Sequence, residues 1–379
     1  MINIAFTGGG TGGHIYPGLA VAAELQKRLQ GEYRLFWIGS SAGMDRSIVE
    51  SEGIDFFGVP SGKLRRYFSF KNIIDTFKIL SGFLKSKKIL KKQKATLLFS
   101  KGGFVSVPPC AAAAALRIPV FTHESDFSPG LATKINIRFV KRTGGKIFTT
   151  YEDTERFFSP KIRDRVILSG NPVRDVFREG QRANSKEEIE EGKKREGERI
   201  ILVLGGSQGA QEINELVLET LPQLTKYYTV VHQFGSSNKW NLQETERYKP
   251  YPYIKDELPF IMKAAEIILG RSGAGIWEWA VCGKPMILIP LSGTVSRGDQ
   301  WENARYFEKA GAAVVLKKKT ETNSCNGGLR QVLAEVVEDL ANNAAKREAM
   351  AAASLKIGEK NGAAIIADVL VNQLGGNVD

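Results

Sequence analysis

The sequence is poor in cysteine, and the cysteines that it has form no pair or cluster. Its 379 residues include three, Cys110, Cys282 and Cys325, and no CxxC motif. This spacing argues against a structural zinc site or a disulfide framework and suits a reducing cytosol. No Asp-x-Asp pair stands where it could bridge a metal ion to a diphosphate, so we expect neither a metal ion nor another cofactor.

Long apolar runs are also missing. The most apolar stretch, Phe104 to Phe121, is interrupted by prolines and an arginine and therefore cannot be a membrane-spanning helix. The chain begins Met1-Ile2-Asn3 and enters an apolar strand at once, so we expect no secretory signal. Hydrophobic residues make up 42% and charged residues 25%, as in soluble globular proteins, and 379 residues suit two domains.

Acidic residues are scarce in one segment of a basic chain. The formal net charge is +12, and much of the excess lies between Lys63 and Lys94, where Asp75 is the single acid. The basic residues there are Lys63, Arg65, Arg66, Lys71, Lys78, Lys85, Lys87, Lys88, Lys91, Lys92 and Lys94. Such a concentration indicates a local surface with a specific role. Because the chain carries no RNA- or DNA-binding signature, we expect no nucleic-acid partner.

Apolar side chains interleave with these basic residues at roughly helical spacing. They are Phe68, Phe70, Ile73, Ile74, Phe77, Leu80, Leu84 and Ile89. An apolar stripe with basic flanks favours a segment that lies on an anionic membrane surface. In the alternative, the stripe packs onto a sheet and the lysines are only solvated.

Short β-branched runs alternate with helical patterns, which is typical of α/β proteins with parallel sheets. The first half predicts a helix that begins near Pro17 and strands at Ile2–Thr7, Arg34–Ile38, Thr96–Ser100, Pro119–Thr122 and Lys146–Thr149. The second half predicts a helix containing Ile213 and Leu221 and strands at Ile200–Leu204, Thr229–His232, Ile267–Leu269, Met286–Ile289 and Ala313–Leu316.

Two similar α/β domains with a cleft between them are the predicted architecture. We expect the first domain to span residues 1–168 and the second residues 169–349, with a hinge near Ser169–Pro172. A last amphipathic helix, about Ala341 to Leu374, is expected to cross back, so that residues 350–379 pack on the first domain. The almost entirely polar segment from Glu179 to Arg199 is predicted to be a solvated helix or loop.

A glycine loop, Gly8-Gly-Gly-Thr-Gly-Gly-His14, follows the first strand and precedes a helix. Such a loop presents backbone N–H groups and a positive helix end to an anion or a close-packed ligand. It satisfies G-x-G-x-x-G, but the second strand ends Gly39-Ser40-Ser41, without the acid that would hold an NAD ribose. NAD binding is therefore disfavoured, and the absence of a following Gly-Lys-Ser/Thr excludes a Walker loop.

A second glycine loop, Gly205-Gly-Ser-Gln-Gly-Ala210, occupies the equivalent place in the second half. Ser207 can cap the following helix, while the glycines let a diphosphate approach the backbone. In the alternative, the loop is a tight turn without a ligand. Two loops at equivalent places favour ligand binding.

An ordered set of motifs resembles the MurG family of bacterial glycosyltransferases. The matching segments are Gly8–Pro17, Lys101–Pro108, His123–Asp126, Pro129–Ala132, Gly170–Arg174, Gly205–Ala210, Arg271–Glu278 and Ser296–Gln300, with Asn303 close behind. They occur in family order and cover nearly the whole chain.

The resemblance implies a GT-B fold, in which two Rossmann-like, doubly wound domains face an interdomain cleft. It implies inverting transfer of N-acetylglucosamine from UDP-N-acetylglucosamine (UDP-GlcNAc), bound mainly by the second domain, to lipid I, bound by the first. Lipid I is undecaprenyl-diphosphate-linked N-acetylmuramoyl-pentapeptide, and the β-1,4-linked product is the peptidoglycan precursor lipid II. The family works at the cytoplasmic face of the bacterial membrane as a peripheral enzyme. Two alternatives are another GT-B enzyme, such as a diacylglycerol glycosyltransferase, and a non-enzymatic nucleotide-sugar-binding module.

The resemblance also implies roles for single residues. His14 is the expected catalytic base, because imidazole titrates in the range needed to deprotonate an attacking hydroxyl. Arg174 would contact the uracil or its surroundings, Ser207 and Gln208 the diphosphate, and Glu278 the ribose hydroxyls, although Glu278 in the alternative only complements a helix dipole. Asp299, Gln300 and Asn303 would hold the sugar, although helix capping alone could explain Asp299. The remaining donor-binding candidates are Thr11, Gly12, Gly13, Gly209 and Ala274.

The acceptor-binding candidates are Phe104, His123, Glu124 and Asp126. His123 and Glu124 could orient the acceptor or simply satisfy hydrogen bonds of their loop, whereas His232, within a strand, is expected to be structural. The chain departs from the common family pattern at Phe104, which replaces a frequent tyrosine, and at Ser125-Asp126, which replaces Gln-Asn. The segment before Glu278 is one residue shorter than usual, which affects the register of Ala274 and Gly275.

Overall fold

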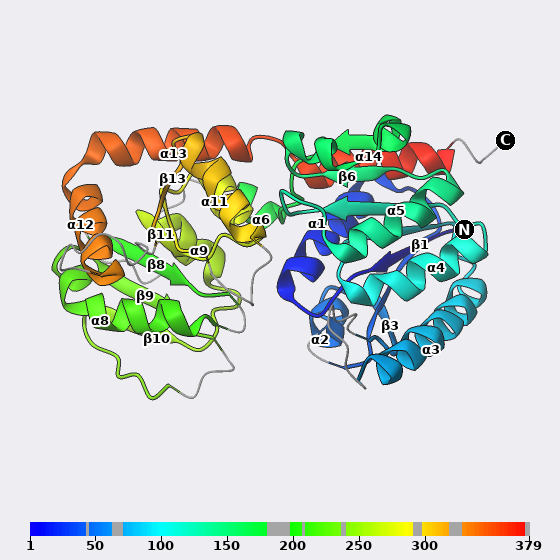
Figure 1. Cartoon of the computed structure of the whole chain (residues 1–379), viewed down its shortest axis with the longest axis horizontal. Helices are drawn as coiled ribbons and strands as arrows, with labels where there is room; N and C mark the ends of the chain where they lie inside the picture. The colour runs from blue at the N-terminus through cyan, green and yellow to red at the C-terminus, as the bar shows by residue number, and fades with distance from the viewer. Residues whose placement is uncertain are drawn as a thin grey trace. The chain divides into compact units, whose positions relative to one another are not determined.

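The chain folds into two units (Figure 1). A computed structural model describes residues 1–42, 45–62, 71–179, 198–206, 209–235, 240–290, 298–317 and 328–375, without the side chains of residues 71–74 and 179. Unit 1 comprises Met1–Arg174 together with Lys360–Asp379, and unit 2 comprises Asp175–Glu359. Residues 169–174, which we expected in the second domain, belong to unit 1. Of residues 350–379, which we expected to pack on the first domain, those from Lys360 onward belong to unit 1 and residues 350–359 to unit 2. The polar segment at 180–197 lies outside the described residues.

Unit 1 contains a seven-stranded sheet, in the order β3-β2-β1-β4-β5-β6-β7, and every pairing is parallel. The strands are β1 Ile2–Thr7, β2 Tyr33–Ser40, β3 Asp55–Val59, β4 Leu97–Ser100, β5 Val120–Glu124, β6 Ile147–Thr149 and β7 Val166–Leu168. β3 and β7, the two edge strands, were not predicted from the sequence. The predicted strands at the other places are confirmed to within two residues at each end.

Helices cover both faces of this sheet, which makes unit 1 doubly wound. The helices are α1 Gly12–Arg28, α2 Asp45–Glu50, α3 Lys71–Lys92, α4 Val107–Ala115, α5 Leu131–Thr143 and α14 Gly362–Gly375, with short 3-10 turns η1 Phe104–Ser106, η2 Glu152–Phe157 and η3 Pro160–Arg165. Alternate residues of β1 point to opposite faces: Ile4 packs with α1 and α14, and Ala5 packs with α3, α4 and α5. Burial of both faces explains why these strands are apolar throughout.

Two helix predictions are wrong, one near the start of the chain and one near its end. The helix α1 begins at Gly12 rather than near Pro17; its first two residues, Gly12 and Gly13, are glycines and add nothing to an apolar periodicity. The single helix expected from Ala341 to Leu374 is divided among α12 Leu329–Asn342, α13 Ala344–Gly358 and α14. Asn343 begins α13, where its side chain accepts from the Lys346 N–H at 2.9 Å. Asn361 precedes α14 and accepts from the Ala364 N–H at 3.2 Å, so each break has its own cap.

Unit 2 contains a six-stranded parallel sheet in the order β10-β9-β8-β11-β12-β13. The strands are β8 Ile200–Leu204, β9 Thr229–Gln233, β10 Tyr248–Tyr251, β11 Ile267–Gly270, β12 Met286–Leu288 and β13 Ala313–Val315. The helices are α6 Asp175–Glu179, α8 Gln211–Tyr227, α9 Leu258–Ala264, α10 Ile276–Val281, α11 Asp299–Lys309, α12 and α13. β10 was not predicted. Two doubly wound α/β units are the predicted fold class, which is confirmed.

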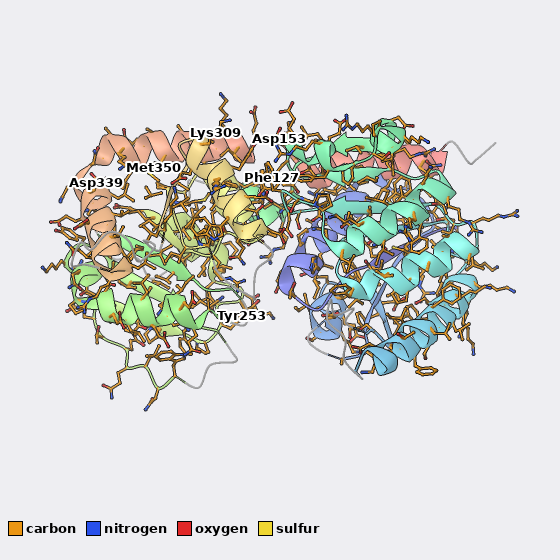
Figure 2. The ribbon with its side chains drawn as sticks, in the orientation of Figure 1. Phe127, Asp153, Tyr253, Lys309, Asp339 and Met350 are labelled. Atoms are coloured by element: carbon orange, nitrogen blue, oxygen red, sulfur yellow. The ribbon has the colours of Figure 1, made fainter. Side chains whose placement is uncertain are left out.

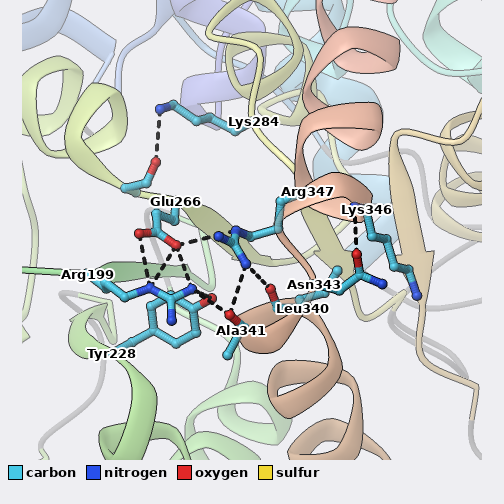
Figure 3. A network of polar contacts seen from close by, with 10 residues as sticks. Arg199, Tyr228, Glu266, Lys284, Leu340, Ala341, Asn343, Lys346 and Arg347 are labelled. Carbon is cyan, nitrogen blue, oxygen red and sulfur yellow. Dashed lines mark hydrogen bonds and ion pairs between the residues drawn. The ribbon is translucent and has the colours of Figure 1, made fainter.

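A polar network holds the amino ends of three strands of unit 2 together (Figure 3). Arg199, just before β8, donates to both carboxylate oxygens of Glu266 at 2.9 to 3.1 Å, to the Tyr228 hydroxyl at 3.1 Å and to the Ala341 carbonyl at 2.9 Å. Arg347 of α13 lies 3.5 Å from the same carboxylate. This network joins β8, β9 and β11 to the end of α12, at the sheet edge opposite the glycine loop.

Within the described part of the chain, no helix is both long enough and apolar enough to cross a membrane.

Candidate active site

His14 lies in the first turn of α1, where two glycine-containing loops meet. Its backbone N–H donates to the Thr11 carbonyl at 3.0 Å, and the residue is half-buried. The ring packs against Gly103, where a Cβ atom would lie only 3.2 Å from the imidazole Cδ2. Since β1 and β4 are parallel neighbours, the loops that follow them, which carry His14 and Gly103, share the carboxyl edge of the sheet. Phe104, half-buried in η1, adjoins this contact.

The predicted acceptor residues His123 and Glu124 are buried and engaged with their own surroundings. Nε2 of His123 lies 3.1 Å from the Gly170 carbonyl oxygen, and burial together with the Lys101 charge holds the pKa of His123 well below its usual value. The Glu124 carboxylate accepts from the backbone N–H groups of Asp126 at 3.0 Å and Gly130 at 2.9 Å. These contacts fit the alternative role, in which the pair satisfies hydrogen bonds of its loop. Asp126 itself is half-buried.

The loop after β5, whose Asp126 and Gly130 N–H groups donate to Glu124, also contacts residues around η2. Phe127, labelled in Figure 2, packs against the Tyr151 ring with centroids 5.4 Å apart, and its carbonyl accepts from the Thr154 hydroxyl at 2.9 Å. The guanidinium of Arg156 lies 5.1 Å from the Phe127 ring. The position of Asp126 is therefore set by η2 as well as by β5.

Lys101 is a buried cation that sequence reasoning placed in a motif but did not select. Its side chain is 1% exposed, and among the described residues its ammonium has no hydrogen-bond acceptor. Burial lowers the pKa of Lys101 to about 8, against the opposing influence of Glu124 and Asp126. Buried groups with perturbed pKa values gather at functional sites, so Lys101 adds to the case for this edge of the sheet.

Arg174 belongs to unit 1 rather than to the unit expected to bind the donor. Its guanidinium carbon lies 4.2 Å from the centroid of the Tyr16 ring, which is a cation–π contact. Because Tyr16 lies in α1 two residues after His14, this contact places Arg174 beside the start of α1. Tyr16 was not predicted as a site residue. An aromatic residue within the first motif was the only signal that could have identified it.

The second glycine loop begins at the carboxyl end of β8 in unit 2. Gly209 donates to the Gly206 carbonyl at 3.0 Å and has φ +80°, so the loop turns tightly before α8. The helix begins at Gln211, with Ala210 at the N-cap position. Ser207 and Gln208 lie outside the described residues.

Arg271 lies beside this loop at the end of the neighbouring strand β11. Its Nη1 is 3.5 Å from the Gly205 carbonyl oxygen, and burial lowers the pKa of the guanidinium. A half-buried cation next to the start of α8 adds positive charge where a diphosphate is expected. The residue stands in a recognised motif, but it was not among the predicted donor residues.

The remaining donor candidates of unit 2 come together around Ser272, which follows β11. The Ser272 hydroxyl donates to the Gln300 carbonyl at 2.6 Å, and the Asn303 amide donates to the Ser272 carbonyl at 3.0 Å. These bonds join the start of α11 to the loop that carries Ala274 and, in the first turn of α10, Glu278. Ala274, Glu278, Asp299 and Gln300 are half-buried, whereas Asn303 is 1% exposed.

For three of these side chains the structure shows surroundings that the sequence left open. Asn303 is tied by its amide to the Ser272 backbone, so part of its hydrogen-bonding capacity serves the fold. Asp299 is the first residue of α11, whose N-cap is Gly298, so helix capping does not account for it. Glu278 does lie in the first turn of α10, where a carboxylate complements the helix dipole.

A cavity of about 300 Å³ lies in unit 2 beside the first turns of α8 and α11, lined by residues that include Glu212, Glu215, Glu219, Trp301 and Arg330. No predicted donor residue that the structure describes lines it.

His232 is structural, as expected. It is buried in β9, with Nδ1 3.0 Å from the Tyr248 hydroxyl and Nε2 3.1 Å from Oδ1 of Asn214. Burial lowers the pKa of His232 to about 4.

Comparisons with known proteins show the family to which the two units belong. Residues 4–144 match the model of the glycosyltransferase family 28 N-terminal domain, and residues 200–369 that of its C-terminal domain. A Treponema pallidum protein is 44% identical over 377 residues, covering 97% of this chain and 94% of its own length. A Treponema denticola protein is 47% identical over 334 residues, covering 83% of each chain. Both are named UDP-N-acetylglucosamine--N-acetylmuramyl-(pentapeptide) pyrophosphoryl-undecaprenol N-acetylglucosamine transferase.

Solved structures support the fold. The crystal structure of MurG from Acinetobacter baumannii aligns with a TM-score of 0.65 at 22% identity, covering 98% of this chain and all of that one. A UDP-GlcNAc 2-epimerase from Neisseria meningitidis, bound to UDP-GlcNAc, aligns with a TM-score of 0.69 at 18% identity, covering 98% and 100%. The implied GT-B fold is thereby confirmed, and the family matches establish that this chain belongs to glycosyltransferase family 28, in the family of N-acetylglucosamine transferases to which its Treponema relatives are assigned by name.

Proposed function

We propose that this chain transfers N-acetylglucosamine from UDP-GlcNAc to the C4 hydroxyl of N-acetylmuramic acid in lipid I, with inversion, to form lipid II. One observation carries the proposal: a relative named for this transfer is 44% identical across 97% of the chain. The site residues agree with it, since each unit carries a glycine loop at the carboxyl edge of its sheet. In open α/β sheets, ligands bind at that edge.

The chemistry asks two things of the protein. The acceptor hydroxyl must lose its proton as it attacks the anomeric carbon, and the departing UDP must be stabilised as negative charge develops on it. We assign the first task to His14, whose imidazole is held against Gly103 at the start of α1. We assign the second to the amino end of α8 and to the Arg271 guanidinium beside it.

Donor recognition falls to the cluster around Ser272. A carboxylate can accept hydrogen bonds from two vicinal hydroxyls, so Glu278 suits the ribose. Asp299 and Gln300, in the first turn of α11, are half-buried next to this cluster and suit the sugar hydroxyls. Because Ser272 bonds the backbone at Gln300, the ribose-binding and sugar-binding residues are fixed relative to one another.

The acceptor is anchored in a membrane, and α3 suits the surface of one. Phe77, Leu80 and Leu84 are 69%, 55% and 58% exposed, and their spacing places them on one face of the helix. Lysines of the same helix are exposed around them: Lys78, Lys85, Lys87, Lys88, Lys91 and Lys92. We therefore propose peripheral attachment to an anionic membrane, at its cytoplasmic face, where nucleotide sugars are found. The expected residues Phe68 and Phe70 lie outside the described part of the chain.

The direct test is a transfer assay with radiolabelled UDP-GlcNAc and a lipid I analogue, run beside diacylglycerol as a competing acceptor. Label in a lipid-linked disaccharide supports the proposal, whereas label only in glycosyl-diacylglycerol assigns the chain to a different lipid glycosyltransferase. The variant His14→Ala should bind UDP-GlcNAc with unchanged affinity and lose turnover. Turnover that survives this change would remove His14 as the base.

A further inference from the structure

We propose that Asp45 is a positioning residue for the transfer: its buried carboxylate anchors the glycine loop at Gly10 and thereby sets the place of His14. The inference rests on the proposed function, because it assigns Asp45 a part in the same reaction. Asp45 belongs to none of the sequence motifs and is separated from the loop by 35 residues.

The loop needs an anchor from outside because of its composition. Gly9 has φ +157° and Gly10 has φ +85°, conformations that glycine adopts freely and other residues avoid. The same freedom makes a glycine segment costly to order, so its native path must be held by contacts with other parts of the molecule.

Asp45 supplies such contacts at the middle of the loop. The Gly10 N–H donates to both carboxylate oxygens, at 3.0 and 3.1 Å. A Cβ atom at Gly9 would lie 2.0 Å from Oδ2 of Asp45, so only glycine lets the backbone come this close. The carboxylate also accepts from the Ser40 N–H at 3.3 Å, which ties the loop to the end of β2.

The burial of Asp45 points to a specific role for its charge. The residue is fully buried, and burial raises the pKa of its carboxyl, while hydrogen bonds from Gly10 and Ser40 oppose the rise. A buried carboxylate is unfavourable unless hydrogen bonds compensate it, and the hydrogen bonds that Asp45 accepts from the described residues come from backbone N–H groups at the glycine loop and at β2.

On the side opposite Asp45, the first glycine loop contacts His14 and the segment 101–103. The Gly9 carbonyl oxygen and the His14 ring both lie against Gly103, and the Gly8 backbone lies against Lys101 and the His14 carbonyl. The loop is therefore enclosed between Asp45 and the segment 101–103, with α1 starting directly after it. A shift at Gly10 would be passed on to the first turn of α1, and thus to the imidazole.

The test is the near-isosteric change Asp45→Asn, whose amide cannot accept through both terminal atoms. We expect kcat to fall about 10- to 100-fold, because a misplacement of about 1 Å costs on the order of 100-fold in rate. The Kd for UDP-GlcNAc should stay within about twofold, since the residues proposed above for the ribose, the sugar and the diphosphate lie in unit 2. Hydrogen exchange of the Gly10 amide should accelerate, which reports the anchor independently of activity.

Thr7→Val is the matched control. Thr7 is as buried as Asp45, lies at the end of β1, and donates to the Ile38 carbonyl at 2.8 Å without touching the loop N–H. It should lower Tm while leaving kcat and Gly10 exchange near those of the wild type. Equal loss of kcat in Thr7→Val would overturn the proposal, because general destabilisation would then explain the effect.

Two further results decide the remaining cases. If Asp45→Asn does not fold, Asp45→Glu keeps the charge but displaces it by one methylene, and a wild-type kcat in that variant would overturn the anchor. If His14→Ala retains turnover, the assignment of the base fails, while the exchange of the Gly10 amide still shows whether Asp45 holds the loop.

Discussion

Replacing Phe77, Leu80 and Leu84 by serine should release the protein from anionic membranes. Full burial of a phenylalanine or leucine side chain contributes about 1.5–3 kcal/mol. These side chains are 69%, 55% and 58% exposed, so together about two complete side chains remain for burial in lipid. The expected loss is about 4 kcal/mol, or roughly a thousandfold in the partition coefficient. The fold should be unaffected, because the exposed atoms contribute little to the core.

Co-sedimentation with vesicles containing anionic lipid measures the effect, and titration with UDP-GlcNAc checks that donor binding is intact. Leu355→Ser is the matched control, because Leu355 is 43% exposed on α13 of unit 2, outside the basic helix. It should leave partitioning unchanged. If the triple serine variant sediments like the wild type, α3 is not the membrane-binding surface.

The remaining predictions concern charge and stability. Changing Lys85, Lys87, Lys88, Lys91 and Lys92 to Glu should abolish binding to anionic vesicles and leave donor binding intact. The reason is that each lysine near an anionic membrane surface contributes about 1 kcal/mol to binding. Unchanged co-sedimentation with the vesicles would contradict this prediction. Glu266→Gln should lower the free energy of unfolding in urea by about 1–2 kcal/mol, a range that allows for the partial exposure of the ion pair with Arg199. The control Glu50→Gln, in the exposed ion pair with Arg46, should change the free energy of unfolding by less than about 0.5 kcal/mol. Leu370→Ala should cost about 2–5 kcal/mol, because this fully buried side chain of α14 packs in the core of unit 1, and hydrogen exchange should show the loss in β1 and not in β8. The pKa of His232 falls from 6.5 to about 4 on folding, so the unfolded chain binds more protons than the folded chain between these pH values. The contribution of His232 to the free energy of unfolding should therefore be fully present above pH 6.5 and decrease by up to about 3 kcal/mol toward pH 4. Amide exchange in β9 should show this pH dependence, and His232→Asn should remove it.

The predicted fold was accurate where the sequence signal is local and strong. Buried parallel strands are continuous apolar runs, so Ile2–Thr7 and Ile200–Leu204 were predicted with their observed bounds. β3, β7 and β10 were missed because they are less uniformly buried than the other strands and carry a weaker apolar pattern. The start of α1 was missed because glycines have no side chains to show helical periodicity.

The candidate site shows the same division. Motifs identified His14, Glu278 and the glycine loops, because each motif is contiguous in the chain. They did not include Asp45, and they contained Tyr16, Lys101 and Arg271 without assigning them a role. Those side chains acquire their roles from neighbours distant in sequence, such as Gly10 for Asp45 and Arg174 for Tyr16.

The amino-acid order alone was enough to establish the family, the two-fold α/β plan and the residues of the contiguous motifs, because apolar periodicity and glycine loops are properties of short segments. Folding decided which buried groups meet and which apolar groups stay exposed: Asp45 accepts from Gly10, and Phe77, Leu80 and Leu84 face outward rather than onto the sheet. An apolar stripe on a helix has the same sequence pattern whether it packs inward or remains exposed. The donor to a buried carboxylate is set by packing between segments distant in sequence, so both features depend on three-dimensional contacts.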